Sequence, residues 1–276
     1  MNNGLKYVCF VVFSLFLSSC ENDSSSYVKN DSFDQDIDSL KANQSGIDSA
    51  AIVKEVIPII PESIPCDWDT YLIAEGLVNI RDIDSSIMVE LKYSTTDNFM
   101  QRDMYGCLEN CYLQPDIAER LKLCQSELKS RDSTLTLLVY DGLRPRLVQQ
   151  FMWDLLDMPL NEKTKFVSNP AKGSLHNFAA AVDITLYDLT THQALDMGTP
   201  YDYIGVLAWP TKEASLLKDS LLTQEQVDNR ILLRKVMQTG KFFNIQTEWW
   251  HFNACYRDKA KELYHIIEGD TSLIKI

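Results

Sequence analysis

The stretch SLHNFAAAVDITLY, residues 174–187, decides the fold, because a polar loop runs directly into a strand pattern. Apolar residues at positions 182, 184 and 186 alternate with polar ones, which is the period-two pattern of a β-strand. His176 stands in the loop and Asp183 stands in the strand. A tight turn between them would bring both side chains to one point at the edge of a sheet.

Working outward from this stretch, apolar patterns predict further strands and helices. Residues 135–140, LTLLVY, form a short apolar run that is typical of a buried strand, and residues 77–81, 87–92 and 247–252 also have strand composition. Residues 115–128, 146–156 and 224–238 place apolar side chains on one helical face. Helices and strands alternate irregularly, so the sequence predicts a single α+β domain with helices packed around a central antiparallel or mixed sheet.

The charge balance excludes one class of partner. The chain has 276 residues, with 26 Lys+Arg against 39 Asp+Glu and a formal net charge of −13. A protein that binds nucleic acid needs a basic face to neutralise phosphates, so we expect no nucleic-acid partner. Residues 66–276 have a length that suits one compact domain, which we predict to be the functional one.

The N-terminal residues have the pattern of a bacterial lipoprotein signal. Lys6 precedes an apolar run of signal-peptide length, and the Leu-Ser-Ser before Cys20 resembles a lipobox. We therefore expect residues 1–19 to be a signal peptide and Cys20 to carry a lipid anchor, which would place the protein in the cell envelope, facing the periplasm or the cell surface. Residues 20–65, rich in Ser, Asp and Asn, would form a flexible acidic tether. The alternative is a plain secretory signal in which Cys20 occurs by chance.

An odd number of cysteines remains beyond the signal: Cys66, Cys107, Cys111, Cys124 and Cys255. They cannot all pair internally. Cys107 and Cys111 are close enough in sequence to bridge, whereas buried thiols are favoured for Cys124 and Cys255. No second Cys or His pair follows the CLENC spacing, so a zinc ribbon is not indicated. Neither the pairing nor the oligomeric state follows from the sequence.

Two further segments carry residues of catalytic type. EWWHF, residues 248–252, supplies Glu248 and His251, and DGLRP, residues 141–145, supplies Arg144 directly after a predicted strand. A catalytic zinc takes three protein ligands and leaves a fourth position for water. His176, Asp183 and His251 would make such a set.

The remaining residues of these segments suit the other roles in a hydrolysis. Glu248 would take the proton of the water, and Arg144 would stabilise the oxyanion of a tetrahedral intermediate. On a regular strand Glu248 and His251 point to opposite faces, so both reach one site only if the segment bends, bulges or leaves Glu248 in the incoming loop. The alternative is that the two histidines are structural, that EWWHF is a core strand and that Arg144 is a surface or capping residue.

Taken together, the segments resemble the D-alanyl-D-alanine dipeptidase family, the VanX-like branch of the M15 zinc peptidases. The matching motifs, in chain order, are VELKYSTTDNF (89–99), CYLQPDIAERL (111–121), DGLRP (141–145), SLHNFAAAVDITLY (174–187), MGTPYD (197–202), NRILL (229–233) and EWWHF (248–252). The order of several separate motifs is more specific than any one of them.

The resemblance implies roles for individual residues. One zinc per chain, in a cleft at the sheet, would be held by His176, Asp183 and His251. Glu248 would be the base and Arg144 would polarise the scissile carbonyl. Asp202 would bind the free amino group of the substrate, and Ser174 would hydrogen-bond near the site.

Two positions depart from the family pattern. Ala179 stands where SxHxxGxAxD has glycine, so a positive φ at this position would strain the chain. Leu143 stands where a tyrosine usually precedes Arg-Pro. Residues 204–222 have no match to the family, which leaves the rim of the pocket undefined.

The resemblance implies a zinc dipeptidase that hydrolyses D-alanyl-D-alanine, here from cell-wall turnover. Two alternatives stay open: a zinc D,D-carboxypeptidase that acts on longer murein peptides, and a catalytically silent lipoprotein that binds wall peptides. A closed pocket anchored by Asp202 favours the dipeptide, and an open groove favours the longer chain.

Overall fold

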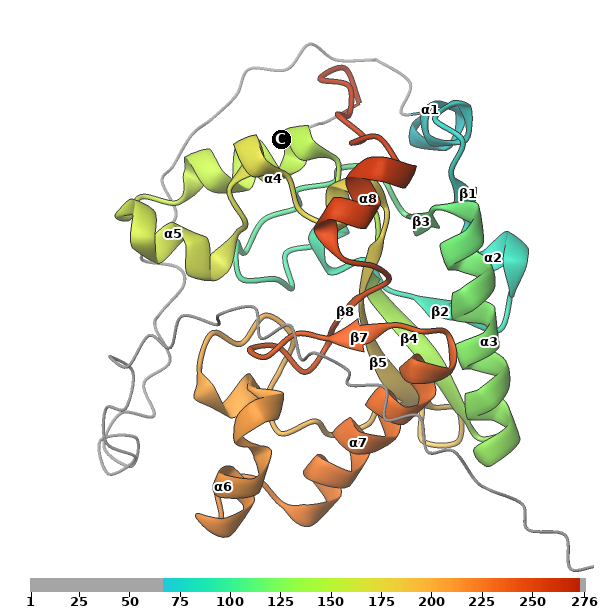
Figure 1. Cartoon of the computed structure of the whole chain (residues 1–276), viewed down its shortest axis with the longest axis vertical. Coiled ribbons are helices and arrows are strands. Elements are labelled where there is room, and N and C mark those ends of the chain that lie inside the picture. The colour runs from blue at the N-terminus through green and yellow to red at the C-terminus, as the bar shows by residue number, and fades with distance from the viewer. Residues whose placement is uncertain (1–66, 274–276) are drawn as a thin grey trace, which may run out of the picture. The chain divides into compact units, whose positions relative to one another are not determined.

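Two long strands, β4 (Leu135–Asp141) and β5 (Ala181–Asp188), form an antiparallel pair at the centre of the fold (Figure 1). They belong to a mixed sheet of order β2-β4-β5-β8-β7, in which β2 is parallel to β4 and β6 pairs separately with β5. The shorter strands of this sheet are β2 (Met88–Val89), β6 (Gln193–Ala194), β7 (Phe243–Asn244) and β8 (His251–Asn253). The predicted α+β fold with a mixed central sheet is confirmed.

The computed structural model describes residues 67–273, all of which belong to one unit, Ser45–Ile276. The predicted signal peptide, Cys20 and the tether lie outside the described residues and stay predictions. Within residues 67–273, no helix combines the length and the apolar character needed to cross a bilayer.

The three predicted helices are confirmed as α3 (Pro115–Arg131), α4 (Arg146–Leu155) and α7 (Gln224–Thr239). Pro115 occupies the first turn of α3, where its missing N–H leaves no hydrogen bond unmade. Thr223 and Gln226 form a reciprocal capping box that starts α7. The helix α3 packs on both β4 and α7, so it runs alongside the central strands in Figure 1.

The remaining elements are short, and the sequence patterns did not predict the helices among them. Among them are the helices α1 (Trp68–Ala74), α2 (Ile80–Ile83), α5 (Leu160–Phe166), α6 (Glu213–Lys218) and α8 (Arg257–Leu263), and a two-stranded sheet of β1 (Val78–Asn79) with β3 (Tyr112–Leu113). Helices of two turns or fewer contain too few residues for a period of 3.6 to emerge.

Three predicted strands are shorter than expected. The prediction for residues 77–81 is wrong beyond Asn79, whose side chain accepts from the Arg81 N–H and starts α2. The prediction for residues 87–92 holds only for Met88–Val89. The prediction for residues 247–252 is wrong before His251, where β8 begins.

The cysteines divide into two groups. Cys107 forms a disulfide, whereas Cys111, Cys124 and Cys255 carry free thiols. A bridge between Cys107 and Cys111 therefore does not form. Cys111 and Cys124 are buried in the apolar core, as favoured for Cys124, and Cys255 is half-buried.

Candidate metal centre and active site

Three polar residues lie in one row across the central sheet. Asp183 of β5 is the register partner of His251 on β8, and Asp141 of β4 is the register partner of Asp183 on its other side. A register irregularity between Val139 and Asp141 brings Asp141 into this row. Strand pairing therefore unites residues that are more than a hundred positions apart in the chain.

His176 reaches the row from a tight turn. It begins the 3₁₀ helix η5 (His176–Phe178), which ends at Ala179 in the left-handed conformation with φ 52° and ψ 37°. The chain then enters β5 two residues later. The positive φ considered for this position is present, and alanine there carries a strain of roughly 1 kcal/mol that glycine would avoid.

A buried amide holds this turn in place. The Asn177 side chain accepts from the Ser174 N–H at 2.7 Å and donates to the Arg144 carbonyl at 2.7 Å. It also donates to Gln149 Oε1, which accepts the Ser174 hydroxyl at 2.7 Å. Ser174 lies at the site, as the resemblance implied, but its proton is committed to Gln149.

Glu248 lies in the loop that enters β8, not in the strand. Asn244 of β7 fastens this loop, because its amide donates to the Glu248 carbonyl at 2.8 Å and to the His251 carbonyl at 2.7 Å. Glu248 Oε2 is 4.0 Å from His251 Nδ1. The loop thus lets Glu248 and His251 face the same site, which a regular strand would prevent.

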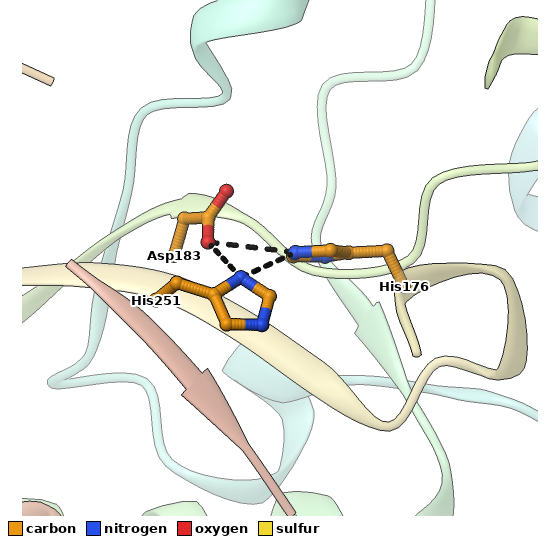
Figure 2. A group of neighbouring side chains, drawn as sticks. All are labelled: His176, Asp183 and His251. Carbon is orange, nitrogen blue, oxygen red and sulfur yellow. Dashed lines mark hydrogen bonds and ion pairs between the residues drawn. The ribbon is translucent and has the colours of Figure 1, made fainter. Parts of the chain in front are cut away.

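The three candidate ligands converge in space, as Figure 2 shows. His251 Nδ1 is 2.9 Å from Asp183 Oδ1 and 3.1 Å from His176 Nε2, and His176 Nε2 is 3.4 Å from Asp183 Oδ1. Ligand atoms of a tetrahedral zinc at 2.0–2.1 Å from the metal are about 3.3 Å apart. The triangle therefore has the size of one face of such a tetrahedron.

Each histidine has an outer ring nitrogen, which faces the protein, and an inner one, which faces the other candidate ligands. The hydrogen bond of the outer nitrogen determines whether the inner nitrogen can bind a metal. His176 Nδ1 lies 2.7 Å from the Gly142 carbonyl, and His251 Nε2 lies 2.9 Å from Asn253 Oδ1, so each outer nitrogen donates its proton to an acceptor. Each inner nitrogen then presents a lone pair beside the Asp183 carboxylate. With both rings neutral, these three donor atoms can bind one cation, and N and O donors of this kind fit zinc.

The charges of the site favour the same conclusion. Burial would raise the pKa of Asp183, but the neighbouring His176 and His251 hold it well below its usual range. Burial would lower the pKa of His251, but its hydrogen bond with Asp183 and the charge of that carboxylate raise it to about 9. The row therefore attracts positive charge to this point.

Arg144 lies beside the row as a fixed cation. Its Nε and Nη2 donate to Asp141 Oδ2 at 3.0 and 2.6 Å, and Nη2 is 3.8 Å from Asp183 Oδ2. The guanidinium also lies over the Tyr93 ring at 4.7 Å. Burial opposes its charge, but Asp141 outweighs this and raises the pKa of Arg144 well above its ordinary value.

Asp202 is close to the site but outside the row of ligands. The Tyr93 hydroxyl donates to Asp202 Oδ2 at 3.0 Å, and the Tyr201 hydroxyl next to it in sequence donates to Asp183 Oδ2 at 2.9 Å. Burial and the charge of Asp183 raise the pKa of Asp202 well above its usual range. A buried carboxyl group of this kind gains from a cationic partner, such as an ammonium group.

The loop that carries Tyr201 and Asp202 is held at both ends by one side chain. Buried Arg230 of α7 donates from Nε to the Met197 carbonyl at 2.6 Å and from Nη2 to the Leu207 carbonyl at 3.0 Å. Trp249 adds a hydrogen bond to Thr199 Oγ1 at 2.8 Å. The NRILL motif therefore contributes the side chain that holds the Asp202 loop.

These residues open into one cavity of about 340 Å³. Its polar lining includes Arg144, Ser174, His176, Asp183, Asp202, Glu248 and His251. This volume is near the lower end of the range for small-molecule sites, roughly 300–1,000 Å³. All seven side chains implied by the resemblance thus come together, and their individual roles stay predictions.

Sequence reasoning missed several partners of these residues. Asp141, Tyr93 and Tyr201 each lie inside a quoted motif but received no role, and neither did Asn177 or Asn253. The signal available was weak: a polar residue at a strand end or beside a ligand. Their contacts depend on strand register and loop packing, which the sequence pattern does not contain.

The comparison with protein families agrees with this geometry. The family model described as peptidase M15, D-ala-D-ala dipeptidase, matches residues 73–266. The chain belongs to this family. It is accordingly a metallopeptidase, a hydrolase of peptide bonds, and the group His176, Asp183 and His251 is its possible metal-binding site.

Several curated relatives of this M15 peptidase are similar along most of their length. The chain is 31% identical to a D-alanyl-D-alanine dipeptidase of Escherichia coli (strain K12) over 176 residues, which cover 64% of this chain and 83% of that protein. It is 27% identical to a D-alanyl-D-alanine dipeptidase of Enterococcus faecium over 194 residues, covering 64% and 90% respectively. A relative of the same name from Streptomyces coelicolor (strain ATCC BAA-471 / A3(2) / M145) is 28% identical over 192 residues, covering 63% and 88%.

Proposed function

We propose that this protein is a zinc-dependent dipeptidase that hydrolyses D-alanyl-D-alanine. One observation carries the proposal: the potential ligand atoms of His176, Asp183 and His251 converge beside Glu248, in a cavity of about 340 Å³ that Asp202 also lines. The shared name of the relatives supports the choice of substrate.

Each side chain has a distinct task in this reaction. Zinc bound by His176, Asp183 and His251, one per chain, would polarise the scissile carbonyl and lower the pKa of water. Glu248 takes the proton of the attacking water and passes it to the leaving amine; burial raises the pKa of its carboxyl, which suits a group that both accepts and donates. Arg144 stabilises the oxyanion with Nη1, the guanidinium nitrogen that Asp141 does not bind.

The amino end of the substrate is assigned to Asp202. Tyr93 orients this carboxyl group with a 3.0 Å hydrogen bond, and an incoming ammonium would supply the charge that burial denies it. A dipeptide fits this arrangement because its amino group lies one residue from the scissile bond.

We also propose that the protein works in the cell envelope, anchored through a lipid on Cys20. The lipobox-like sequence before Cys20 supports this location. The substrate would then be peptide released by cell-wall turnover, so the enzyme would act in recycling or nutrition.

A D,D-carboxypeptidase acting on longer murein peptides is a second candidate, and one observation favours it. A cavity of about 610 Å³ adjoins the site and shares Phe166, Asp202 and Ile204 with it. A longer peptide could continue past Asp202 into this space.

One experiment separates the candidates. The full chain, loaded with zinc, would be tested on D-alanyl-D-alanine, L-alanyl-L-alanine and a murein pentapeptide. We expect hydrolysis of the first substrate alone, and none by the Glu248→Gln variant. Cleavage of the pentapeptide would favour the carboxypeptidase, whereas binding without turnover would favour a silent wall-peptide-binding protein.

A further inference from the structure

The carboxylate end of the substrate needs a partner that the residues assigned so far do not supply. A dipeptide in this cavity presents an ammonium, which Asp202 would take, and a terminal carboxylate at its other end. The cavity already contains the carboxyl groups of Asp183, Asp202 and Glu248, which would repel this carboxylate. A cationic donor at that end of the site would offset this repulsion locally.

Two polar residues of the cavity lining, Ser174 and Arg144, already have partners or a proposed role. The Ser174 hydroxyl donates its only proton to Gln149 Oε1 at 2.7 Å, so it has none left for a carboxylate. Arg144 donates from Nε and Nη2 to Asp141, and the proposed reaction assigns its Nη1 to the oxyanion.

Arg257 is the other cationic residue that lines the cavity. It begins α8, six positions after His251, so β8 and a short loop carry it to the rim of the site. Among residues 67–273 no carboxylate lies within 4 Å of its guanidinium, in contrast to Lys259 on the same helix, which is 2.9 Å from Glu262. A guanidinium with no carboxylate partner in the described part of a chain of net charge −13 is available for an anionic ligand.

The surroundings of Arg257 and of Asp202 have opposite charge. Arg257 also lines a cavity of about 670 Å³ that contains Lys172 and Lys261 and no Asp or Glu. Asp202 instead lines the cavity of about 610 Å³, where Lys92 is neutralised by Asp97 at 2.6 Å. These two cavities share no lining residue, and they meet the site at different places, one at Asp202 and the other at Arg257.

We propose that Arg257 binds the terminal carboxylate of the substrate. The proposal deepens the proposed function and rests on it. The guanidinium fork matches a carboxylate in two hydrogen bonds, so the site would align a zwitterion between Asp202 and Arg257 with the scissile bond at His176, Asp183 and His251. Arg257 would thereby restrict cleavage to the last peptide bond of a chain with a free C-terminus.

The test compares two substrates that differ only at the C-terminus, D-alanyl-D-alanine and D-alanyl-D-alaninamide. In the zinc-loaded full chain, Arg257→Ala should raise KM for the acid by roughly 10-fold, because a charge-assisted hydrogen bond is lost. KM for the amide should not change, and kcat should change little for either substrate. Arg257→Lys should restore part of the preference for the acid, and the matched control Lys259→Ala should leave both substrates unaffected.

The outcomes distinguish this inference from the function on which it rests. A wild-type enzyme that hydrolyses the acid, with an acid-to-amide ratio that Arg257→Ala leaves unchanged, would overturn the role of Arg257 alone. A wild-type enzyme inactive on both substrates would overturn the proposed function and the inference together. Equal losses on acid and amide would show that Arg257 acts on the structure of the rim, which also contradicts the proposal.

Discussion

The metal-ligand side and the substrate side of this site are held in place by different means. Asp183 and His251 are adjacent across two hydrogen-bonded strands, so the backbone ladder itself sets their spacing. Asp202 lies in a loop whose two ends depend on one guanidinium, that of Arg230. From this difference we predict that a change in the loop alters substrate binding without disturbing the candidate ligands.

The largest expected effect is on kcat, and it distinguishes the proposed base Glu248 from the candidate metal ligands. Glu248→Ala should retain zinc and lose kcat by roughly 10²–10⁴-fold, because Glu248 moves the proton and is not needed to hold the metal. His251→Ala should lose zinc as well as activity. Metal content and kcat measured on both purified variants check this; zinc loss in Glu248→Ala would make Glu248 a ligand.

A smaller effect, on KM, is expected from a change that disturbs only the loop that carries Asp202. Arg230→Lys keeps a charge but cannot donate to the Met197 and Leu207 carbonyls together. We expect KM for the dipeptide to rise by roughly 10-fold, with zinc content unchanged, as for the loss of a hydrogen bond to a charged group.

Arg234→Lys is the matched control for the loop. Arg234 pairs with Glu213 at 2.8 and 2.5 Å but makes no hydrogen bond to the loop. If both variants raised KM equally, the position of the Asp202 loop would not depend on Arg230 in particular.

A substitution in the turn that positions His176 should change the stability of the protein and leave its activity unaltered. Ala179→Gly removes the strain of a left-handed alanine, and the gain exceeds the extra backbone entropy of glycine, so we expect about 0.5 kcal/mol of added stability. Thermal unfolding should shift upward by about 1–2 °C. A lower melting temperature would mean that the alanine methyl packs better than its backbone is strained.

The smallest effect concerns two free thiols that differ in burial. Burial raises the pKa of Cys124 to about 12, so its reactive thiolate is scarce at pH 8, whereas Cys255 is half-buried at the rim of the cavity. Iodoacetamide should modify Cys255 first in the folded protein, and Cys124 only after unfolding. Mass spectrometry of a time course checks the order, and early labelling of Cys124 would contradict it.

The sequence predicted the parts of the fold that repeat a local pattern. The helices α3, α4 and α7 and the strands β4 and β5 are long enough to show one apolar face or an unbroken apolar run. Short elements such as α6 and β7 were not predicted, because a few residues cannot display a period. The strand predicted through residues 247–252 failed for another reason: aromatic composition indicates burial, and a buried loop has it too.

The features of the site also fall into those that the sequence predicted and those that it did not. Residue type and motif order by themselves determined the family, the three candidate ligands and the candidate base, because zinc chemistry restricts which side chains can take part. The register of β4, β5 and β8 decided that Asp141, Asp183 and His251 share a row, and loop packing decided that Glu248 faces it. Only the tertiary structure could decide these points, because distances between residues far apart in the chain arise from pairing and packing, which no local pattern encodes.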